Sequence, residues 1–234
     1  MKLIIEKNKK AAVKKAASII AEIIKKKPTA VLEIATGSTM IPLYKELVRM
    51  YKKGEIDFSG VRTFNLDEYT DIKFNDHESY HYYMNKNLFD KVNIKKHNTN
   101  FPSYHGKLYE KEIEEVGGID LGILGIGVNG HIAFNEPGSS FNSQTREVKL
   151  SENTIKTNSR LFSNIKKVPK DAYTVGIETI MKSREIILLA FGSKKTEAIL
   201  SAAKGPINEK SPASILRKHK NAIFILDKKA AKRL

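Results

Sequence analysis

The chain has 234 residues, of which 41% are hydrophobic and 29% are charged, values that are ordinary for a globular protein and exclude a disordered or fibrous one. It has no cysteine, which excludes a disulfide framework, a thiolate metal site and a cysteine nucleophile. Its 41 lysines and arginines outnumber 26 acidic residues and give a net charge of +15. These basic residues are scattered along the chain, and no zinc-finger or aromatic RNA-binding motif accompanies them. We therefore expect a solvated basic surface and no nucleic-acid partner.

From the N-terminus on, the sequence alternates between helical and strand patterns. Residues 7–27 place apolar side chains at helical spacing between lysines, which predicts a surface helix with one buried stripe. Short runs of branched apolar residues predict buried strands over 30–35, 61–66, 119–127, 173–177, 185–191 and 222–227. The intervening segments predict helices over about 42–53, 77–90, 105–116, 194–203 and 211–218.

This alternation predicts an α/β fold with a doubly wound, mainly parallel, Rossmann-like sheet that carries helices on both faces. Since no repeat or low-complexity linker interrupts the pattern, we expect a single domain over residues 1–234. The longest apolar run, 186–191, is far shorter than the roughly 18 residues that a membrane span needs, and the N-terminus lacks a signal-peptide stretch. We therefore expect a cytoplasmic protein with no membrane partner.

The first polar loop follows the strand at 30–35, at a position where such sheets bind ligands. It contains Thr36, Gly37, Ser38 and Thr39, and the next helix is expected to begin near Pro42. Small residues expose backbone N–H groups, hydroxyls add donors, and the helix N-terminus adds partial positive charge, a combination that suits a phosphate group. The same residues also fit a plain strand-to-helix turn with a Ser or Thr cap.

Ionisable side chains follow the next two strands. Asp67, in "FNLDEYTD", is placed to be partly buried, which would suit a general base, although an Asp after a strand more often caps a turn. His131 and Glu136 lie in the glycine-rich stretch "LGIGVNGHIAFNEPGSSF", where Glu136 can accept a ring N–H of His131 and fix its tautomer. Arg160 and Lys195 can add charge-assisted bonds to a phosphate, although each alone is typical of a surface charge.

Seven sequence blocks, in order over about residues 30–200, resemble the glucosamine-6-phosphate deaminase family. The blocks are ATGST, FNLDEY, ESYHYYM, LGIGVNGHIAFNEPGSSF, TNSRLF, VPKDAYTVGIETIM and FGSKKTEAI, and the C-terminal AIFILDKKAA is also similar. The resemblance implies an enzyme of amino-sugar metabolism that converts glucosamine 6-phosphate and water to fructose 6-phosphate and ammonia. It implies no cofactor and no metal, which agrees with the lack of a clustered Cys or His ligand pattern.

The resemblance also implies a role for each candidate residue. Asp67 would be the base that shuttles a proton, His131 would assist opening of the sugar ring, and Glu136 would orient His131. The phosphate would be held by Thr36, Gly37, Ser38, Thr39, Arg160 and Lys195. Many family members carry Asp where this chain has Asn129, and there the Asp forms a charged triad with the His and Glu; an amide accepts a hydrogen bond but brings no charge.

The hexameric family members bind N-acetylglucosamine 6-phosphate as an effector through a basic cluster. Ser139 and Arg146 match that cluster, but Val148 stands at the position of a second basic side chain. We therefore expect a monomer or small homo-oligomer that this effector does not activate.

Three alternatives remain open at this point. The sequence does not distinguish glucosamine from galactosamine 6-phosphate, which differ in the orientation of one hydroxyl. A 6-phosphogluconolactonase-like hydrolase shares the fold and a Gly-His loop, but its pattern does not continue as Phe-Asn-Glu-Pro. A sugar-phosphate sensor without catalysis would keep the phosphate loop and usually lose the base, whereas Asp67, His131 and Glu136 are all present here.

Overall fold

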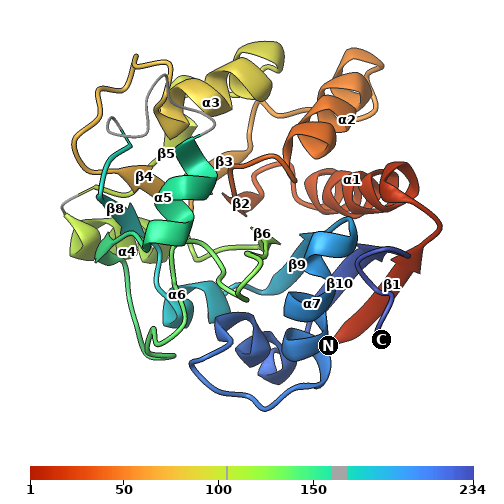
Figure 1. Cartoon of the computed structure of the whole chain (residues 1–234). Coiled ribbons are helices and arrows are strands. Elements are labelled where there is room, and N and C mark those ends of the chain that lie inside the picture. The colour runs from red at the N-terminus through yellow and green to blue at the C-terminus, as the bar shows by residue number, and fades with distance from the viewer. Residues whose placement is uncertain (104, 160–167) are drawn as a thin grey trace.

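The computed structural model describes residues 1–103, 105–159 and 168–234. Its centre is a sheet of seven strands, all of them paired in parallel (Figure 1). In spatial order these are β1 (Lys2–Glu6), β10 (Ala222–Asp227), β9 (Glu185–Ala190), β6 (Leu121–Gly125), β2 (Val31–Ile34), β3 (Arg62–Asn65) and β5 (Thr99–Asn100). The first strand of the chain therefore lies at one edge of the sheet and pairs with the last one.

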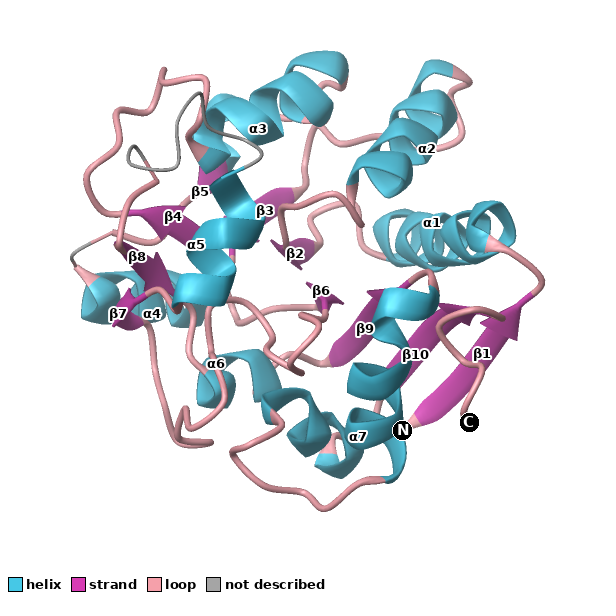
Figure 2. Cartoon of the chain, viewed as in Figure 1, coloured by secondary structure: helices cyan, strands magenta, loops and turns pink. Residues whose placement is uncertain are grey.

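Helices cover both faces of this sheet, with α1 and α2 on one side and α6 and α7 on the other (Figure 2). The α-helices are α1 (Lys9–Lys26), α2 (Ile41–Lys52), α3 (Tyr80–Asn87), α4 (Gly106–Glu115), α5 (Glu152–Asn158), α6 (Ile177–Met181) and α7 (Thr196–Lys204). Short 3₁₀ helices span Phe89–Lys91, Lys96–Asn98, Ser193–Lys195 and Pro212–Lys218. The architecture confirms the expected doubly wound, mainly parallel α/β fold.

Local sequence explains how these elements begin and end. Asn8 caps α1 by accepting the N–H of Ala11 at 3.0 Å, and Lys25 and Lys26 lie in its last turn, where cations stabilise the helix dipole. The buried stripe of α1 is made of Ala12, Val13, Ala16, Ala17, Ile20, Ala21 and Ile24. Strands β2, β6 and β9 are buried over almost their whole length because helices cover both of their faces.

One buried strand carries a charged side chain into the core. Glu33, in the middle of β2, has no exposed surface, and its backbone lies in register with Phe64 of β3 and Gly122 of β6. A Cβ atom at position 122 would lie 3.4 Å from Glu33 Oε2, so the carboxyl group lies beside Gly122. No described residue forms a hydrogen bond with either Glu33 carboxyl oxygen.

A second, smaller sheet was not expected from the sequence. It is antiparallel and consists of β4 (Asp67–Tyr69), β8 (Asp171–Thr174) and β7 (Arg146–Lys149), with β8 in the middle. The strand expected over 173–177 in the main sheet is therefore wrong, because residues 173 and 174 end β8 in the second sheet and Ile177 begins α6. A separate small core packs against the second sheet and contains Tyr69, Tyr80, Phe134, Leu150, Val168 and Ala172.

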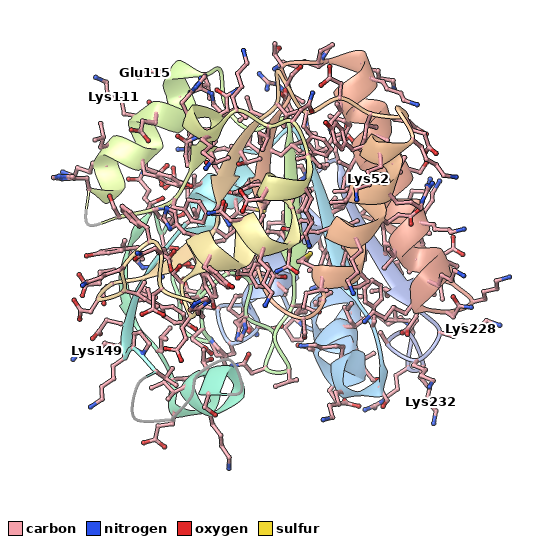
Figure 3. All side chains as sticks on the ribbon, turned by 90° about the horizontal axis from the view of Figure 1, so that it is seen from above. Lys52, Lys111, Glu115, Lys149, Lys228 and Lys232 are labelled. Atoms are coloured by element: carbon pink, nitrogen blue, oxygen red, sulfur yellow. The ribbon has the colours of Figure 1, made fainter. Side chains whose placement is uncertain are left out.

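Other differences concern short elements. The sequence patterns did not indicate β1, β4, β5 or β7, and the segment over 211–218 forms a 3₁₀ helix that Pro212 opens. None of the described helices combines the length and the apolar composition of a membrane span. Figure 3 shows lysines pointing outward from separate elements, among them Lys52 of α2, Lys111 of α4 and Lys149 of β7, so the positive charge is distributed over the surface.

Candidate active site

The order of the strands selects one edge of the sheet for a ligand site. From β2 the chain continues to β3 on one side, whereas β6 and then β9 lie on the other side of β2 (Figure 1). Ligands of such sheets bind beyond the carboxyl ends of the strands, at the point where the order reverses. Because β9, β6, β2 and β3 are neighbours, the loops that leave them meet at this edge, and these loops carry Lys195, His131, Thr36 to Thr39, and Asp67.

The loop after β2 combines an unusual backbone with a helix N-terminus. Gly37 has φ of 96°, a left-handed conformation that favours glycine, although a Cβ atom there would have free space. Its carbonyl oxygen accepts the hydroxyl of Tyr83 at 2.7 Å and the N–H of Met40 at 3.0 Å, which fix the turn. Met40, the N-cap residue of α2, accepts no hydrogen bond with its side chain. The first backbone N–H groups of α2 therefore have no side-chain cap and can bind an anion.

Asp67 is buried in the second sheet, directly beyond β3. It is 7% exposed, and its Oδ1 accepts the hydroxyl of Thr174 at 2.6 Å and the N–H of Phe134 at 3.0 Å. Burial raises the pKa of Asp67 to about 7, although both hydrogen bonds oppose the rise. Its partners come from distant parts of the chain, so Asp67 does not cap a local turn, and near neutral pH its carboxyl can both take up and release a proton.

The imidazole ring of His131 packs against the backbone of a glycine, Gly127. A Cβ atom at Gly127 would lie 2.4 Å from Cε1 of the imidazole, so the ring packs directly against the Gly127 backbone. The Gly127 N–H donates to the His131 carbonyl oxygen at 2.9 Å and closes the turn. Nδ1 of His131 lies 3.5 Å from Oε1 of Glu136, a distance at which attraction is mainly electrostatic because no aligned hydrogen bond forms.

The Glu136 carboxylate is the most heavily bonded group of the site. Its Oε2 accepts the amide of Asn129 at 2.6 Å, and its Oε1 accepts the hydroxyls of Ser151, at 3.1 Å, and Thr154. Burial raises the pKa of Glu136, but its interactions with His131, Thr154 and Asn129 outweigh burial and lower it to about 2. Glu136 is therefore negatively charged at physiological pH.

Asn129 makes two contacts in the same turn. Besides donating to Glu136, it accepts the backbone N–H of His131 on its Oδ1 at 3.3 Å. The amide thus joins the backbone next to the imidazole to the carboxylate that faces the ring. An aspartate here could not donate a hydrogen bond to Glu136 unless it were protonated.

Lys195 approaches the same edge from the other side. It lies at the start of α7, and its Nζ donates to the carbonyl oxygen of Ile126 at 2.7 Å, next to the turn that carries His131. Burial lowers the pKa of Lys195 from its ordinary value. Arg160, the other expected phosphate ligand, lies outside the described residues.

The sequence did not indicate three of the partners described above, Thr174, Ser151 and Thr154. Thr174 lies 107 positions from Asp67, and Ser151 and Thr154 show only the spacing of a helix cap. Within the described residues, no three His, Asp or Glu side chains gather in a way that could hold a metal ion.

Comparison with known proteins finds similarity over nearly the whole chain. The model of the family of glucosamine-6-phosphate isomerases and 6-phosphogluconolactonases matches residues 6–225. A glucosamine-6-phosphate deaminase of Thermoanaerobacter pseudethanolicus is 49% identical over 238 residues, which cover 99% of this chain and 94% of the relative. A glucosamine-6-phosphate deaminase of Clostridium botulinum strain Hall is 48% identical over 241 residues, which cover 100% and 99%.

Among solved structures, a monomeric glucosamine-6-phosphate deaminase superposes with a TM-score of 0.96 at 39% identity, with 99% of each chain covered. The 6-phosphogluconolactonase of Trypanosoma brucei superposes with a TM-score of 0.78 at 18% identity, with 100% of this chain and 98% of the other covered. The second match is evidence of a shared fold alone.

Proposed function

Because the chain belongs to the family of glucosamine-6-phosphate isomerases and 6-phosphogluconolactonases, we propose that its site converts glucosamine 6-phosphate and water to fructose 6-phosphate and ammonia. One observation carries this proposal. Asp67, a base with a pKa near neutral, and His131, which faces the ionised carboxylate of Glu136, lie at the same edge of the sheet. Full-length similarity to deaminases at 48–49% identity supports deamination over lactone hydrolysis.

The reaction begins with opening of the sugar ring, which we assign to His131. Glu136 faces Nδ1 and favours a proton on that nitrogen, so Nε2 is free to take the proton of the anomeric hydroxyl. Protonation of the ring oxygen then breaks its bond to C1. The product is an open-chain aldehyde that carries an amine at C2.

Asp67 performs the isomerisation in this proposal. Its carboxylate removes the proton from C2 while the C1 oxygen takes a proton from the protonated C2 amine, which gives an enolamine, and the resulting carboxylic acid returns a proton to C1, which leaves a protonated C2 imine. A pKa of about 7 suits both steps, because the group must be able to accept and donate a proton at neutral pH. Water then adds to C2, ammonia leaves, and the C2 ketone of fructose 6-phosphate remains.

The substrate phosphate binds at the loop between β2 and α2. Thr36, Ser38 and Thr39 supply hydroxyls there, and α2 supplies the positive end of its dipole. Lys195 exchanges its bond to the Ile126 carbonyl oxygen for a stronger one to the phosphate, and Arg160 adds a second positive charge.

We also propose that the enzyme acts as a monomer. The solved relative that covers 99% of this chain is described as monomeric, which supports this view. Sedimentation of the purified protein at several concentrations tests it, and a hexamer would refute it.

The activity is tested by ammonia release from glucosamine 6-phosphate and from galactosamine 6-phosphate, with hydrolysis of 6-phosphogluconolactone as the control. We expect ammonia release with the glucosamine substrate to exceed the other two activities. Faster turnover of the galactosamine substrate would change the assigned sugar, and lactone hydrolysis without ammonia release would refute the proposal.

A further inference from the structure

The first turn of α5 supplies two hydroxyl groups to the site. Ser151, the N-cap of α5, accepts the backbone N–H of Thr154 at 3.2 Å, and its Oγ lies 3.1 Å from Thr154 Oγ1. Both hydroxyls donate to the same atom, Oε1 of Glu136. The cap that starts the helix therefore also binds a carboxylate that lies 15 residues earlier in the chain.

These contacts fix the carboxylate from both sides. Asn129 binds Oε2 at 2.6 Å, and the hydroxyls of Ser151 and Thr154 bind Oε1, so rotation of the carboxylate would break at least one hydrogen bond to a charged group. Thr154 is 6% exposed, so water cannot readily replace its hydroxyl.

The orientation of the carboxylate determines what His131 faces. Oε1 is the oxygen that lies 3.5 Å from His131 Nδ1, and Nδ1 is buried without an aligned hydrogen bond to any described residue. The tautomer of the ring is set by the hydrogen bond or charge that one of its nitrogens meets. If Oε1 turned away, this preference for a proton on Nδ1 would be lost.

We propose that Ser151 and Thr154 are positioning residues, whose hydroxyls hold Glu136 so that Oε1 faces His131 Nδ1 and Nε2 stays free to accept the sugar proton. This inference rests on the proposed deamination. It makes the start of α5 part of the machinery for ring opening, although neither side chain needs to touch the substrate.

The test uses Thr154→Val, which keeps the shape of the side chain but removes its hydroxyl, and Thr154→Ser, which restores the hydroxyl. The matched control is Thr179→Val, because Thr179 is also buried and donates to a glutamate, Glu110, at 2.7 Å outside the site. For the full chain of each variant, kcat and KM are measured with glucosamine 6-phosphate. The nitrogen-15 shifts of His131 in the ligand-free protein report which ring nitrogen carries the proton.

We expect Thr154→Val to lower kcat about tenfold, the effect of one lost hydrogen bond to a charged group, with KM unchanged because the phosphate binds elsewhere. Its His131 signals should show a mixture of tautomers, whereas Thr154→Ser and Thr179→Val should keep the Nδ1-protonated form. Equal kcat in Thr154→Val and Thr179→Val, or a His131 tautomer that stays unchanged in Thr154→Val, would overturn the proposal. If the unmodified protein released no ammonia, the proposed function would fail, and the tautomer measurement would still decide this inference.

Discussion

Replacing Glu33 by glutamine should stabilise the protein by an amount that grows with pH. Burial, together with the smaller effect of the negative charges of Glu110 and Asp67, raises the pKa of Glu33 to about 8. The unfolded chain releases this proton near the ordinary value of 4.5, whereas the folded chain keeps it until about pH 8. The folded state therefore loses stability relative to the unfolded state as pH rises from 4.5 to about 8, and the loss levels off above that.

The size of this effect follows from the two pKa values. Each pH unit between them costs about 1.4 kcal/mol, so the penalty at pH 7 is about 3 kcal/mol and most of it accumulates above pH 5. Glutamine has nearly the same shape as glutamic acid and does not titrate, so Glu33→Gln should avoid the penalty while the pocket beside Gly122 stays filled.

Urea unfolding of the wild type and of Glu33→Gln, followed by circular dichroism at pH 5, 6, 7 and 8, measures the difference. We expect the stability advantage of the variant to grow by about 2–3 kcal/mol between pH 5 and pH 7. The exposed Glu114 provides a control, since Glu114→Gln should show no such trend. A difference between the wild type and Glu33→Gln that stays constant with pH would show that Glu33 does not titrate in this window and would refute the reasoning.

Four further outcomes follow from the site. Asp67→Asn should lower kcat by about 10²–10⁴-fold while calorimetry still detects binding of the sugar phosphate, and rates near those of the wild type would contradict its role as the base. Since the carboxylate form of Asp67 is the active one and its pKa is about 7, kcat/KM should rise with pH through 7 and then level off; a flat profile would contradict this. Lys195→Ala should raise KM through the loss of a charge-assisted phosphate bond, and an unchanged KM would place the phosphate elsewhere. Gly127→Ala should displace the His131 ring and reduce kcat in a folded protein, and full activity would mean that the ring does not need this contact.

The sequence predicted the main sheet well because its strands are buried on both faces. Five of the six expected strands, 30–35, 61–66, 119–127, 185–191 and 222–227, belong to the parallel sheet. Their runs of branched apolar residues are long enough to be distinguished from loops. The sixth has a similar composition but pairs in the second sheet, since composition indicates burial and does not identify the partner strand.

The elements that were missed are short or exposed. Leu3 and Ile5 of β1 are 38% and 49% exposed, and the strand begins at Lys2 and ends at Glu6, so it lacks the pattern of a buried strand. Strands β4 and β5 have only three and two residues. Pairing with distant strands stabilises such elements, and a local pattern does not report that pairing.

For the site, the rule that ligands bind at strand exits was enough to bring Asp67, His131 and the Thr36–Thr39 loop to one edge. The rule could not provide the groups that determine their chemistry. Thr174 reaches Asp67 only because β8 pairs with β4, and the hydroxyl of Thr154 reaches Glu136 only because α5 lies against the turn that carries it. Both contacts depend on tertiary structure that spacing along the chain does not reveal.

The pairing of β1 with β10 has a consequence for how the protein folds during synthesis. β1 is synthesised long before β10 (Ala222–Asp227), the only strand that it pairs with in the described structure. Until then β1 has no strand to pair with. Bringing β1 and β10 together closes the long loop between them, and the contacts that form afterwards must offset the entropy lost in this closure. We expect β1 to join the sheet only after β10 has emerged from the ribosome, so that shortening the chain before residue 222 leaves β1 open to proteases.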